Sequence, residues 1–394
     1  MRIGIDVRCL SDGRKTGVEE YTLNLLHNLF EKDTKNEYIL FFNSFKDPKI
    51  NFDWTEKYPN VKIKKFRLPN KLLNLSFWYL GWPKIDKLIG GADVIFFPNI
   101  IFGSVSKKAK MVVTIHDLSF ERYPETFSLK KRLWHIFINP KKLCRSADKI
   151  IAVSGSTKND LVSIYHINPG KIIVIYSGIS EKFKIISRNE ARMIEVKEKY
   201  GLPYKFILYL GTIEPRKNIG AIVRAYESLK KYAKNNNLDN LEKYKLIIAG
   251  HSGWMEKKIF SEISEIRKRL KNPEDIGIIN FVKDEDKEYV LNLASLFVYP
   301  SFFEGFGFPP LEAMKCGVPV IVSNNSSFPE TVGDAGIMVD PDRPEEIYTA
   351  MKEFFQSKEI QDKLREKGLK KAAGFSWEKT AEEFLNLING INKK

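Results

Sequence analysis

The chain has 394 residues, 43% of them apolar, and this length suits two domains with sizeable cores better than one. Its 64 Lys and Arg outnumber 49 Asp and Glu, and the net charge of +15 favours an anionic partner: a nucleotide, nucleic acid or an acidic membrane surface. Three scattered cysteines argue against a disulfide framework or a zinc ribbon, and the absence of an apolar run of about 20 residues argues against a membrane-spanning helix. Because Asp6 and Arg8 interrupt the short apolar start, no signal peptide is predicted, and we expect a cytoplasmic protein.

Short apolar runs typical of buried strands alternate along the chain with longer amphipathic stretches typical of helices. In the first half the predicted strands are Arg2–Ile5, Tyr38–Phe42, Val61–Phe66, Asp93–Phe97, Met111–Ile115, Lys149–Val153 and Ile172–Ile175, and the predicted helices are Glu19–Phe30, Leu72–Leu88, Leu129–Cys144 and Thr157–Ile164. In the second half the predicted strands are Phe206–Leu210, Lys245–Ala249, Ile276–Ile279, Leu296–Tyr299, Val318–Val322 and Gly336–Val339, and the predicted helices are Asn189–Tyr200, Ile219–Tyr232, Met255–Leu270, Glu285–Ala294, Pro310–Cys316, Glu345–Gln356 and Ile360–Ala372. This alternation predicts an α/β fold with parallel sheets covered by helices on both faces.

The alternation breaks once, near Ser177 and Gly178, and this break predicts the domain junction. The expected N-terminal domain is 1–177 and the expected second domain is 178–375. A last helix, Trp377–Ile391, stands apart from the series, with Ser376 as its expected N-cap.

The segment from Phe302 to Val322 has the pattern of an anion site between two carboxylates. Glu304 is followed by Gly305, Phe306 and Gly307, and a Pro-Pro pair then opens a predicted helix with Glu312 in its first turn. Glycines allow backbone N–H groups to approach an anion, and a helix start adds aligned dipoles. Ionised carboxylates accept hydrogen bonds from hydroxyl groups. Diphosphate and hydroxyl groups together indicate a sugar nucleotide.

Two more polar clusters follow predicted strands, where open parallel sheets bind their ligands. Arg216 and Lys217 follow Phe206–Leu210, and two fixed cations there would stabilise a diphosphate leaving group, although alone they could be a solvated pair in a loop. His116 ends Met111–Ile115 and could act on a reacting sugar as a hydrogen-bond donor or a backbone-polarising group, or could be satisfied locally at the strand end. These strand ends predict a cleft between the two domains.

The loop 12–17 follows the first strand and could bring backbone N–H groups to a phosphate, or could be a flexible connection. It lacks the full glycine fingerprint of a dinucleotide site. Two Asp-x-Asp matches, Asp284-Glu-Asp286 and Asp340-Pro-Asp342, could hold a divalent cation. Asp284 resembles a helix N-cap and Asp340 lies in a predicted turn, so we expect neither match to bind metal.

Basic and apolar residues suggest one further contact. Basic residues gather at Lys107-Lys108-Lys110, Lys130-Lys131-Arg132 and Lys141-Lys142-Arg145, and aromatic and aliphatic residues gather at Leu72–Trp82. A peripheral membrane surface would use both, whereas ordinary helix faces would also give these patterns.

The motifs resemble those of a known family, the retaining GT-B group 1 glycosyltransferases. Glu304-Gly-Phe-Gly-Phe-Pro-Pro-Leu-Glu312 is similar to the family signature. Leu210-Gly-Thr-Ile-Glu-Pro-Arg-Lys-Asn218, Thr114-Ile-His-Asp117 and Ser327-Phe-Pro-Glu330 match the family in the same order. The resemblance covers nearly the whole chain and is greatest to the mannosyltransferases that make O-antigen and other polysaccharides.

The resemblance implies two Rossmann-like doubly wound domains (GT-B), with a C-terminal helix, 376–394, that completes the first. It also implies transfer of a hexose, mannose from GDP-mannose, to a glycan or lipid-linked glycan acceptor with retention of configuration and no bound metal. By the same resemblance Arg216 and Lys217 would bind the diphosphate, Glu304 would face the donor sugar, and Gly305, Phe306 and Gly307 would offer N–H groups. Glu312 would hold the ribose, His116 would contact the sugar, and Gly17 would lie close to the phosphates. The leaving phosphate would itself deprotonate the acceptor.

Two departures from the family pattern concern the site. Thr212 stands where many members carry a cation, and Gly17-Val-Glu19-Glu20-Tyr21 replaces Gly-x-Gly-Arg-Tyr, which leaves the acceptor class open. The alternatives are a sugar-nucleotide epimerase of the GT-B type, a UDP-sugar-dependent transferase of the same family, and a nucleic-acid-binding protein. Only charge supports the last, and no nucleic-acid partner is expected. Contact with the inner face of the cell membrane stays open.

Overall fold

The computed structural model describes residues 1–11, 16–45, 50–270 and 272–391, which form two compact units. The first unit contains residues 1–118, 129–178 and 376–394, and the second contains residues 119–128 and 179–375. The chain therefore leaves the first unit after Gly178, one residue beyond the predicted junction. Residues 119–128 belong to the second unit, which the sequence pattern did not predict.

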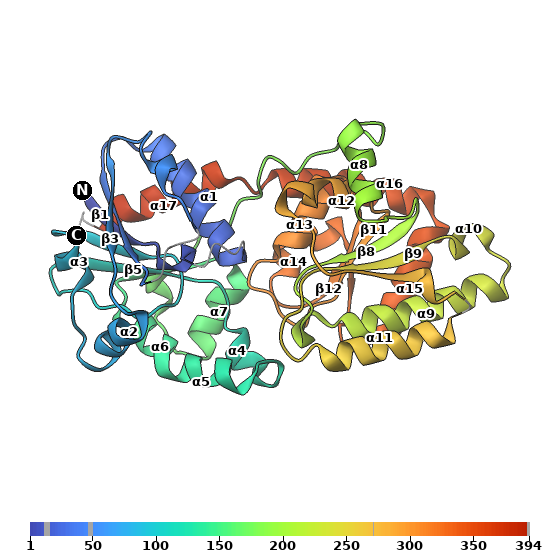
Figure 1. The fold of residues 1–394 in the computed structure, drawn as a ribbon, viewed down its shortest axis with the longest axis horizontal. Helices are drawn as coiled ribbons and strands as arrows, with labels where there is room; N and C mark the ends of the chain where they lie inside the picture. The colour runs from blue at the N-terminus through green and yellow to red at the C-terminus, as the bar shows by residue number, and fades with distance from the viewer. Residues whose placement is uncertain (12–15, 46–49, 271, 392–394) are drawn as a thin grey trace. The chain divides into compact units, whose positions relative to one another are not determined.

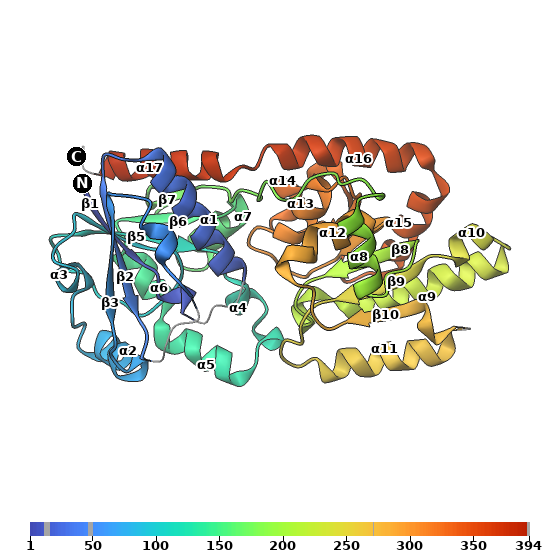
Figure 2. The same ribbon diagram turned by 45° about the horizontal axis from the view of Figure 1, so that its top comes forward.

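The first unit is a seven-stranded parallel sheet in the order β3-β2-β1-β4-β5-β6-β7. Its strands are β1 (Arg2–Asp6), β2 (Glu37–Asn43), β3 (Val61–Phe66), β4 (Val94–Phe97), β5 (Lys110–Ile115), β6 (Lys149–Ala152) and β7 (Ile172–Val174). Its α-helices are α1 (Gly17–Lys32), α2 (Asn70–Tyr79), α3 (Ile85–Leu88), α5 (Leu129–Ile138), α6 (Pro140–Ser146), α7 (Gly155–Ser163) and α17 (Trp377–Ile391). Helices α1 and α17 cover one face of the sheet, and α2, α5 and α6 lie on the other (Figures 1 and 2).

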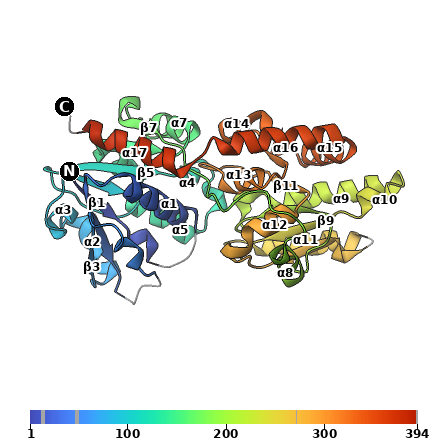
Figure 3. The ribbon, with the colours of Figure 1, turned by 90° about the horizontal axis from the view of Figure 1, so that it is seen from above.

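Helix α17 joins the core of the first unit although it follows the second unit in sequence, and it packs along α1 (Figure 3). Its residue Phe384 is fully buried, with its ring centroid 4.7 Å from that of Phe96 in β4. The Ser376 hydroxyl accepts a hydrogen bond from the N–H of Lys379 at 3.2 Å, as expected of an N-cap. Gly178 passes so close to Trp377 that a Cβ would lie 2.1 Å from its backbone nitrogen, so no larger residue fits there.

The second unit is a six-stranded parallel sheet in the order β10-β9-β8-β11-β12-β13. Its strands are β8 (Phe206–Leu210), β9 (Lys245–Ala249), β10 (Ile276–Ile279), β11 (Leu296–Tyr299), β12 (Val320–Ser323) and β13 (Ile337–Val339). Its α-helices are α4 (Ser119–Arg122), α8 (Ala191–Lys199), α9 (Ile219–Asn235), α10 (Asp239–Glu242), α11 (Lys257–Arg269), α12 (Lys287–Leu293), α13 (Phe308–Lys315), α14 (Phe328–Thr331), α15 (Pro344–Gln356) and α16 (Lys358–Ala373). Helices α9, α11 and α15 pack together on one face, and α8, α12, α13 and α16 cover the other (Figure 1).

Residues 119–128 attach to the second unit through aromatic rings. Phe127 stacks on Trp254 with ring centroids 5.6 Å apart, and the Trp254 indole donates a hydrogen bond to the carbonyl oxygen of Thr126. Tyr123 lies 6.2 Å from Phe302 and 6.0 Å from Phe303, the two residues before Glu304. The segment therefore lies beside the loop that carries the first predicted glutamate.

Two predicted helices are each broken in two. The expected helix Leu72–Leu88 is α2 and α3, separated by Gly81 at φ 58° and by Pro83. The expected helix Leu129–Cys144 is α5 and α6, because Pro140 disfavours a helical conformation at Asn139, which adopts φ 50°. The side chain of Asn139 then caps α6 by accepting a hydrogen bond from the N–H of Lys142 at 3.0 Å.

Candidate functional site

The candidate site in the second unit forms where β8 and β11 end side by side. The two strands are hydrogen-bonded neighbours in the sheet, so the loops that follow them emerge at the same edge. A 3₁₀ turn, Pro215–Lys217, comes after β8 and holds both predicted cations. Asn218, at φ 55°, ends this turn and begins α9. Sheet topology thus brings Arg216 and Lys217 to Glu304, which lies 87 residues further along the chain.

We call Glu214, Arg216, Lys217 and Glu304 the charge cluster. The Lys217 ammonium forms a short ion pair with Glu304. Arg216 lies 3.4 Å from the second oxygen of Glu304 and 2.9 Å from Glu214, measured from guanidinium nitrogen to carboxylate oxygen. Two cations and two carboxylates are therefore held together at a largely buried position.

The charges in this cluster keep Glu304 ionised. Burial by itself would raise the pKa of Glu304, but the neighbouring charges of Lys217 and Arg216 outweigh burial and lower the pKa to about 2. The stacked rings of Tyr209 and Tyr299 form the floor, with centroids 5.5 Å apart, and the Lys217 ammonium lies 5.2 Å from the centre of the Tyr299 ring. Burial raises the pKa of both phenols well above the usual value, so they stay neutral.

The loop after Glu304 offers backbone donors. Among the described residues none accepts a hydrogen bond from the N–H of Gly305 or Gly307, although both glycines are buried. Gly307 adopts φ 88° and caps α13, and a Cβ there would lie 2.6 Å from the Phe328 ring. Buried N–H groups normally have an acceptor, so this loop is suited to an anionic ligand.

Serine hydroxyls fix the loop in place. The N–H of Glu304 donates to the Ser326 hydroxyl at 3.1 Å. Ser301 donates to the carbonyl oxygen of Arg216 at 3.1 Å, and Ser323 donates to the carbonyl oxygen of Ser301 at 2.6 Å. The three strand ends of β8, β11 and β12 are thus tied together beneath the charge cluster.

Glu312 lies two residues further into its helix than predicted, because α13 begins at Phe308 rather than at Pro310. Its carboxylate is fully buried and forms an ion pair with the Lys287 ammonium of α12 at 2.6 Å. The two glutamates of the motif therefore have different environments. Glu304 faces the cations after β8, and Glu312 faces a lysine on a neighbouring helix.

His116 lies in the first unit, at the end of β5. Its Nε2 atom is 2.9 Å from the carbonyl oxygen of Pro98, and its ring lies edge-on to Tyr21 with centroids 4.8 Å apart. Burial lowers the pKa of His116 below its usual value, so the ring is neutral at pH 7. Since a carbonyl only accepts, Nε2 carries the proton, and Nδ1 offers a lone pair. His116 can therefore accept a hydrogen bond from a hydroxyl group, whereas its ring donor is already used.

Gly17 is the first residue of α1 and is exposed. Thr16 is the N-cap, and its N–H donates to the Glu19 carboxylate at 2.8 Å while its side chain accepts from the backbone of Glu19, which forms a capping box. Residues 12–15 of the predicted phosphate loop lie outside the described residues. Glu19 thus has a local structural partner, which accounts for one of the two carboxylates that depart from the family pattern.

The two Asp-x-Asp matches are engaged in local structure. Asp286 is fully buried, 2.7 Å from the Arg192 guanidinium, and also pairs with Lys199. Asp340 accepts a hydrogen bond from the N–H of Asp342 at 2.9 Å and lies 3.5 Å from Arg343. Asp284 was predicted to be a helix N-cap, but in the structure it is the first residue of a 3₁₀ turn whose N-cap is Lys283. In the described part of the chain no group of three or more His, Cys, Asp or Glu side chains is arranged to hold a metal ion.

Comparisons with known proteins show which family the chain belongs to. Residues 193–371 match the family model for glycosyl transferases group 1, and residues 15–183 match the model for glycosyltransferase family 4. The O-antigen chain mannosyltransferase B of Escherichia coli is 33% identical over 94% of this chain and 95% of its own length.

The chain belongs to the group 1 glycosyltransferases. The serotype-specific mannosyltransferase WbdA of Escherichia coli is 31% identical over 71% of this chain, which spans 34% of that protein. This group 1 glycosyltransferase therefore resembles the O-antigen mannosyltransferases, as its motifs predicted.

Solved structures confirm the fold. HepE of Anabaena, crystallised with UDP and glucose, is superposed with a TM-score of 0.72 at 16% identity over 99% of this chain and all of that chain. WaaG, a glycosyltransferase of lipopolysaccharide biosynthesis, gives a TM-score of 0.70 at 14% identity over 98% of this chain and all of that chain. The glycosyltransferase therefore has the two-domain GT-B architecture that the sequence predicted.

The sequence motifs predicted three residues of the charge cluster, but they did not predict the residues that hold the two glutamates of the motif in place. The structure brings Arg216, Lys217 and Glu304 together in the second unit, and His116 and Gly17 lie in the first unit. Lys287, the partner of Glu312, was missed because it reads as one more charge in the polar run from Lys283 to Glu288. Ser326 was missed because its role depends on a left-handed backbone (φ 51°) that a serine does not signal.

Proposed function

We propose that the protein transfers mannose from GDP-mannose to a glycan or lipid-linked glycan acceptor, with retention of anomeric configuration and without a metal. The observation that carries the choice of mannose is the 33% identity with the O-antigen chain mannosyltransferase B over nearly the whole length of both chains. A nucleotide-sugar donor is supported by the charge cluster and by the two buried N–H groups of Gly305 and Gly307.

In this proposal the diphosphate lies against Lys217, Arg216 and the N–H groups of the loop after Glu304. These groups would stabilise the charge that develops on the leaving phosphate as the sugar departs. The ionised Glu304 would accept a hydrogen bond from a donor-sugar hydroxyl, and Glu312 would serve the ribose. His116 would accept a hydrogen bond from the transferred sugar through Nδ1, and Gly17 would approach the phosphates. The leaving phosphate would take the acceptor proton.

Metal independence is proposed because the side chains that could hold a cation have other partners. Asp286 already pairs with Arg192 and Lys199. Lys217 and Arg216 would then provide the positive charge that a metal ion provides in other transferases.

The test supplies purified protein with GDP-mannose, UDP-glucose or UDP-galactose, with and without a mannose-containing glycan, and measures release of nucleoside diphosphate. Acceptor-dependent release of GDP, unchanged by a chelator, and an α-linked product by NMR are expected. Release from UDP-sugars alone would replace mannose by another hexose. Conversion of the donor sugar without an acceptor would instead favour an epimerase, the alternative that the shared fold leaves open.

A further inference from the structure

The face of the first unit formed by α2, α5 and α6 exposes an unusual set of large apolar side chains. Of the 19 such side chains exposed among the described residues, seven lie in residues 68–82 and five in residues 129–137. Those of α2 and the loop after it are Leu72, Leu75, Trp78, Tyr79, Leu80 and Trp82, and those of α5 are Leu129, Leu133, Trp134, Ile136 and Phe137. Soluble surfaces rarely gather apolar residues in this way, so the face is suited to a partner.

Helix α5 contributes almost no side chains to the core of the first unit. Of its ten residues only Ile138 is buried. Its neighbour across the face is α2, since the rings of Trp78 and Phe137 meet edge to face with centroids 5.9 Å apart. The two helices therefore form one continuous apolar surface, which we call the α2–α5 face.

Positive charge surrounds this face. Residues 67–84, 101–110 and 129–147 contain twelve Lys and Arg and no Asp or Glu, against a net charge of +15 for the whole chain. The remainder of the chain is therefore close to neutral, and the excess charge of the protein is concentrated in these three stretches. An anionic surface would be attracted to this part of the molecule, and a positively charged or neutral one would not.

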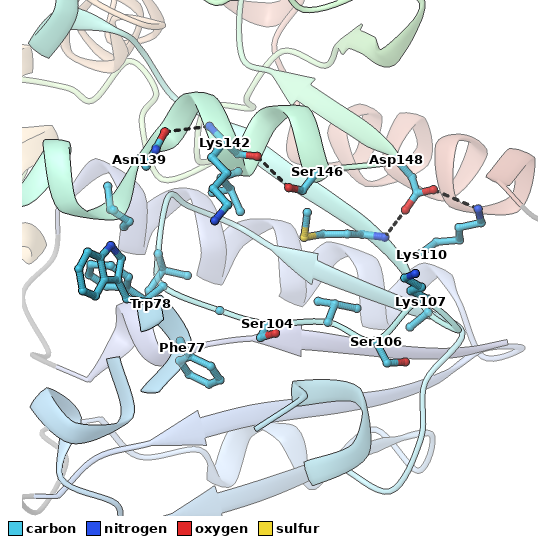
Figure 4. A pocket seen from close by; sticks show the side chains of 18 of the residues that line it. Phe77, Trp78, Ser104, Ser106, Lys107, Lys110, Asn139, Lys142, Ser146 and Asp148 are labelled. Atoms are coloured by element: carbon cyan, nitrogen blue, oxygen red, sulfur yellow. Dashed lines mark hydrogen bonds and ion pairs between the residues drawn. The ribbon is translucent and has the colours of Figure 1, made fainter. Parts of the chain in front are cut away.

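A pocket of about 490 Å³ opens between the two groups of side chains. Phe77 and Trp78 line it from α2, Lys142 from α6, and Lys107 and Lys110 from the loop before β5 and its first residue (Figure 4). Asp148 is the one acidic residue among those lining it in the described part of the chain, and it is paired with Lys110 at 3.0 Å. Lys107 and Lys142 have exposed side chains and no ion pair among the described residues. The pocket is therefore lined by two lysines that have no ion pair among the described residues and, at Trp78 and Phe137, by exposed aromatic rings.

From these observations we infer that the α2–α5 face docks on an anionic phospholipid membrane, with a lipid phosphate in the pocket between Lys107 and Lys142. Apolar side chains of two helices of about 15 Å each would enter the headgroup region, with both helices lying along the surface. Lysine and arginine side chains around them would meet the anionic headgroups. None of the described helices has the length and apolarity to cross a membrane, so this contact is a surface one. The inference goes beyond the proposed transfer reaction and does not depend on it.

The first test is flotation of the purified protein with vesicles of phosphatidylcholine alone or mixed with phosphatidylglycerol. Binding only to the mixed vesicles, weakening as salt is raised, is expected. Equal binding to both vesicles, or to neither, would overturn the inference. Calorimetric titration of the protein with inorganic phosphate in the absence of vesicles separates the two sources of phosphate, because binding of free phosphate by a protein that does not float with the mixed vesicles would mean that the pocket takes a soluble phosphate, and this too would overturn the inference.

Matched variants locate the contact. Lys130→Glu with Arg132→Glu changes two cations in the first turn of α5, and Lys257→Glu with Lys258→Glu makes the same change in the first turn of α11. The α5 pair should weaken binding about 30-fold or more, since each basic residue near such a surface contributes about a factor of five. The α11 pair should leave binding unchanged. Equal losses in the two pairs would mean that only net charge matters and would refute the docking face.

A second matched pair of variants tests the apolar part of the contact. Ile136→Glu in α5 should lower binding about tenfold or more, because an exposed isoleucine loses its place in the lipid, and Ile194→Glu in α8 should not. Both side chains are exposed, so neither variant should alter folding as followed by circular dichroism. If sedimentation instead shows a dimer that Ile136→Glu separates, without vesicle binding, the face joins two copies of the chain and the inference fails.

Discussion

Glu304 is a buried carboxylate whose neighbours decide its chemistry. With Glu214, Arg216 and Lys217 it forms a cluster whose two positive and two negative charges cancel. A diphosphate entering this site would have to share Lys217 with Glu304. The carboxylate that we propose to bind the donor sugar would therefore weaken binding of the nucleotide, and substitution by a neutral isostere can separate the two effects.

If Glu304 acts on the donor sugar as proposed, Glu304→Gln should lower the rate of glycosyl transfer by about 100-fold or more, since its charge is lost. Binding of nucleoside diphosphate should become equal or tighter, because Lys217 is released from its ion pair. Transfer assays and calorimetric titration with GDP would measure the two quantities. Lys217→Ala is the matched change on the other side of the pair, and there both the rate and the affinity should fall.

A weaker nucleotide affinity in Glu304→Gln would contradict the competition between the carboxylate and the diphosphate. Full transfer activity in that variant would remove Glu304 from the reaction altogether.

The depressed pKa of Glu304 also predicts how stability depends on pH. The pKa is about 2 in the folded protein and near its ordinary value in the unfolded chain. The stabilisation is therefore complete above the unfolded value and is lost as pH falls toward the folded value. It amounts to about 3 kcal/mol, of which about 2 kcal/mol is lost by about pH 3.

Urea unfolding of the wild type and of Glu304→Gln between pH 6 and pH 3 would isolate this contribution, because other groups titrate equally in both proteins. The difference in unfolding free energy between them should shrink as pH falls. Parallel curves would mean that Glu304 is not ionised by its neighbours in the folded protein.

Site residues could be predicted from the sequence where a motif directly follows a strand. They could not be predicted where the interaction partner lies in a different segment of the chain. Arg216, Lys217 and Glu304 were predicted together because parallel strands deliver their loops to one edge. Lys287 and Ser326 were not, since nothing local in the sequence ties them to Glu312 and Glu304. The donor role considered for His116 also depended on a remote group, the carbonyl of Pro98, which takes the ring proton.

At the scale of elements, the start of α1 contains a glutamate whose position is explained by helix capping rather than by contact with a substrate. In the sequence, Glu19 departs from the family pattern, and this departure left the acceptor class open. In the structure Glu19 is the N3 residue of a capping box with Thr16. A capping box accepts Glu or Gln at this position, because both side chains can receive the hydrogen bond.

Glu19→Gln should therefore keep both stability and transfer activity, whereas Glu19→Ala should lower stability by about 1 kcal/mol. Chemical denaturation and the transfer assay would be run on both variants. A large loss of activity in the folded Glu19→Gln protein would indicate that its charge acts on a substrate.

Most strand positions were predicted within a residue or two, but helix continuity was not. Strands in parallel sheets are buried on both faces and read as clear apolar runs, as in Phe206–Leu210. The long apolar stretches around Pro83 and Pro140 were read as single helices because their apolar residues continue across the break. In the structure most of the apolar residues of α2 and α5 are exposed, so their apolarity reflects a surface rather than a core.

At the scale of the whole molecule, the chain order and the units do not coincide. The first unit is closed by α17, whose residues Trp377, Phe384 and Ile388 are buried in it. The last helix was predicted to complete the first domain from family resemblance, since no periodicity in a single helix says which sheet it covers. Its importance for the first unit can be tested directly.

Phe384→Ala should destabilise the first unit by about 3–5 kcal/mol, because it removes a fully buried ring that packs on Phe96. Amide hydrogen exchange followed by mass spectrometry should become about 100-fold faster or more in β1, β4 and α1, where exchange requires opening of that unit. Exchange in residues 206–210 and 296–299 should change much less. Phe354→Ala, the same substitution at a buried position of α15 in the second unit, should give the opposite pattern. Equal acceleration throughout the chain in both variants would mean that the two units unfold as one, and that α17 stabilises the molecule as a whole rather than the first unit.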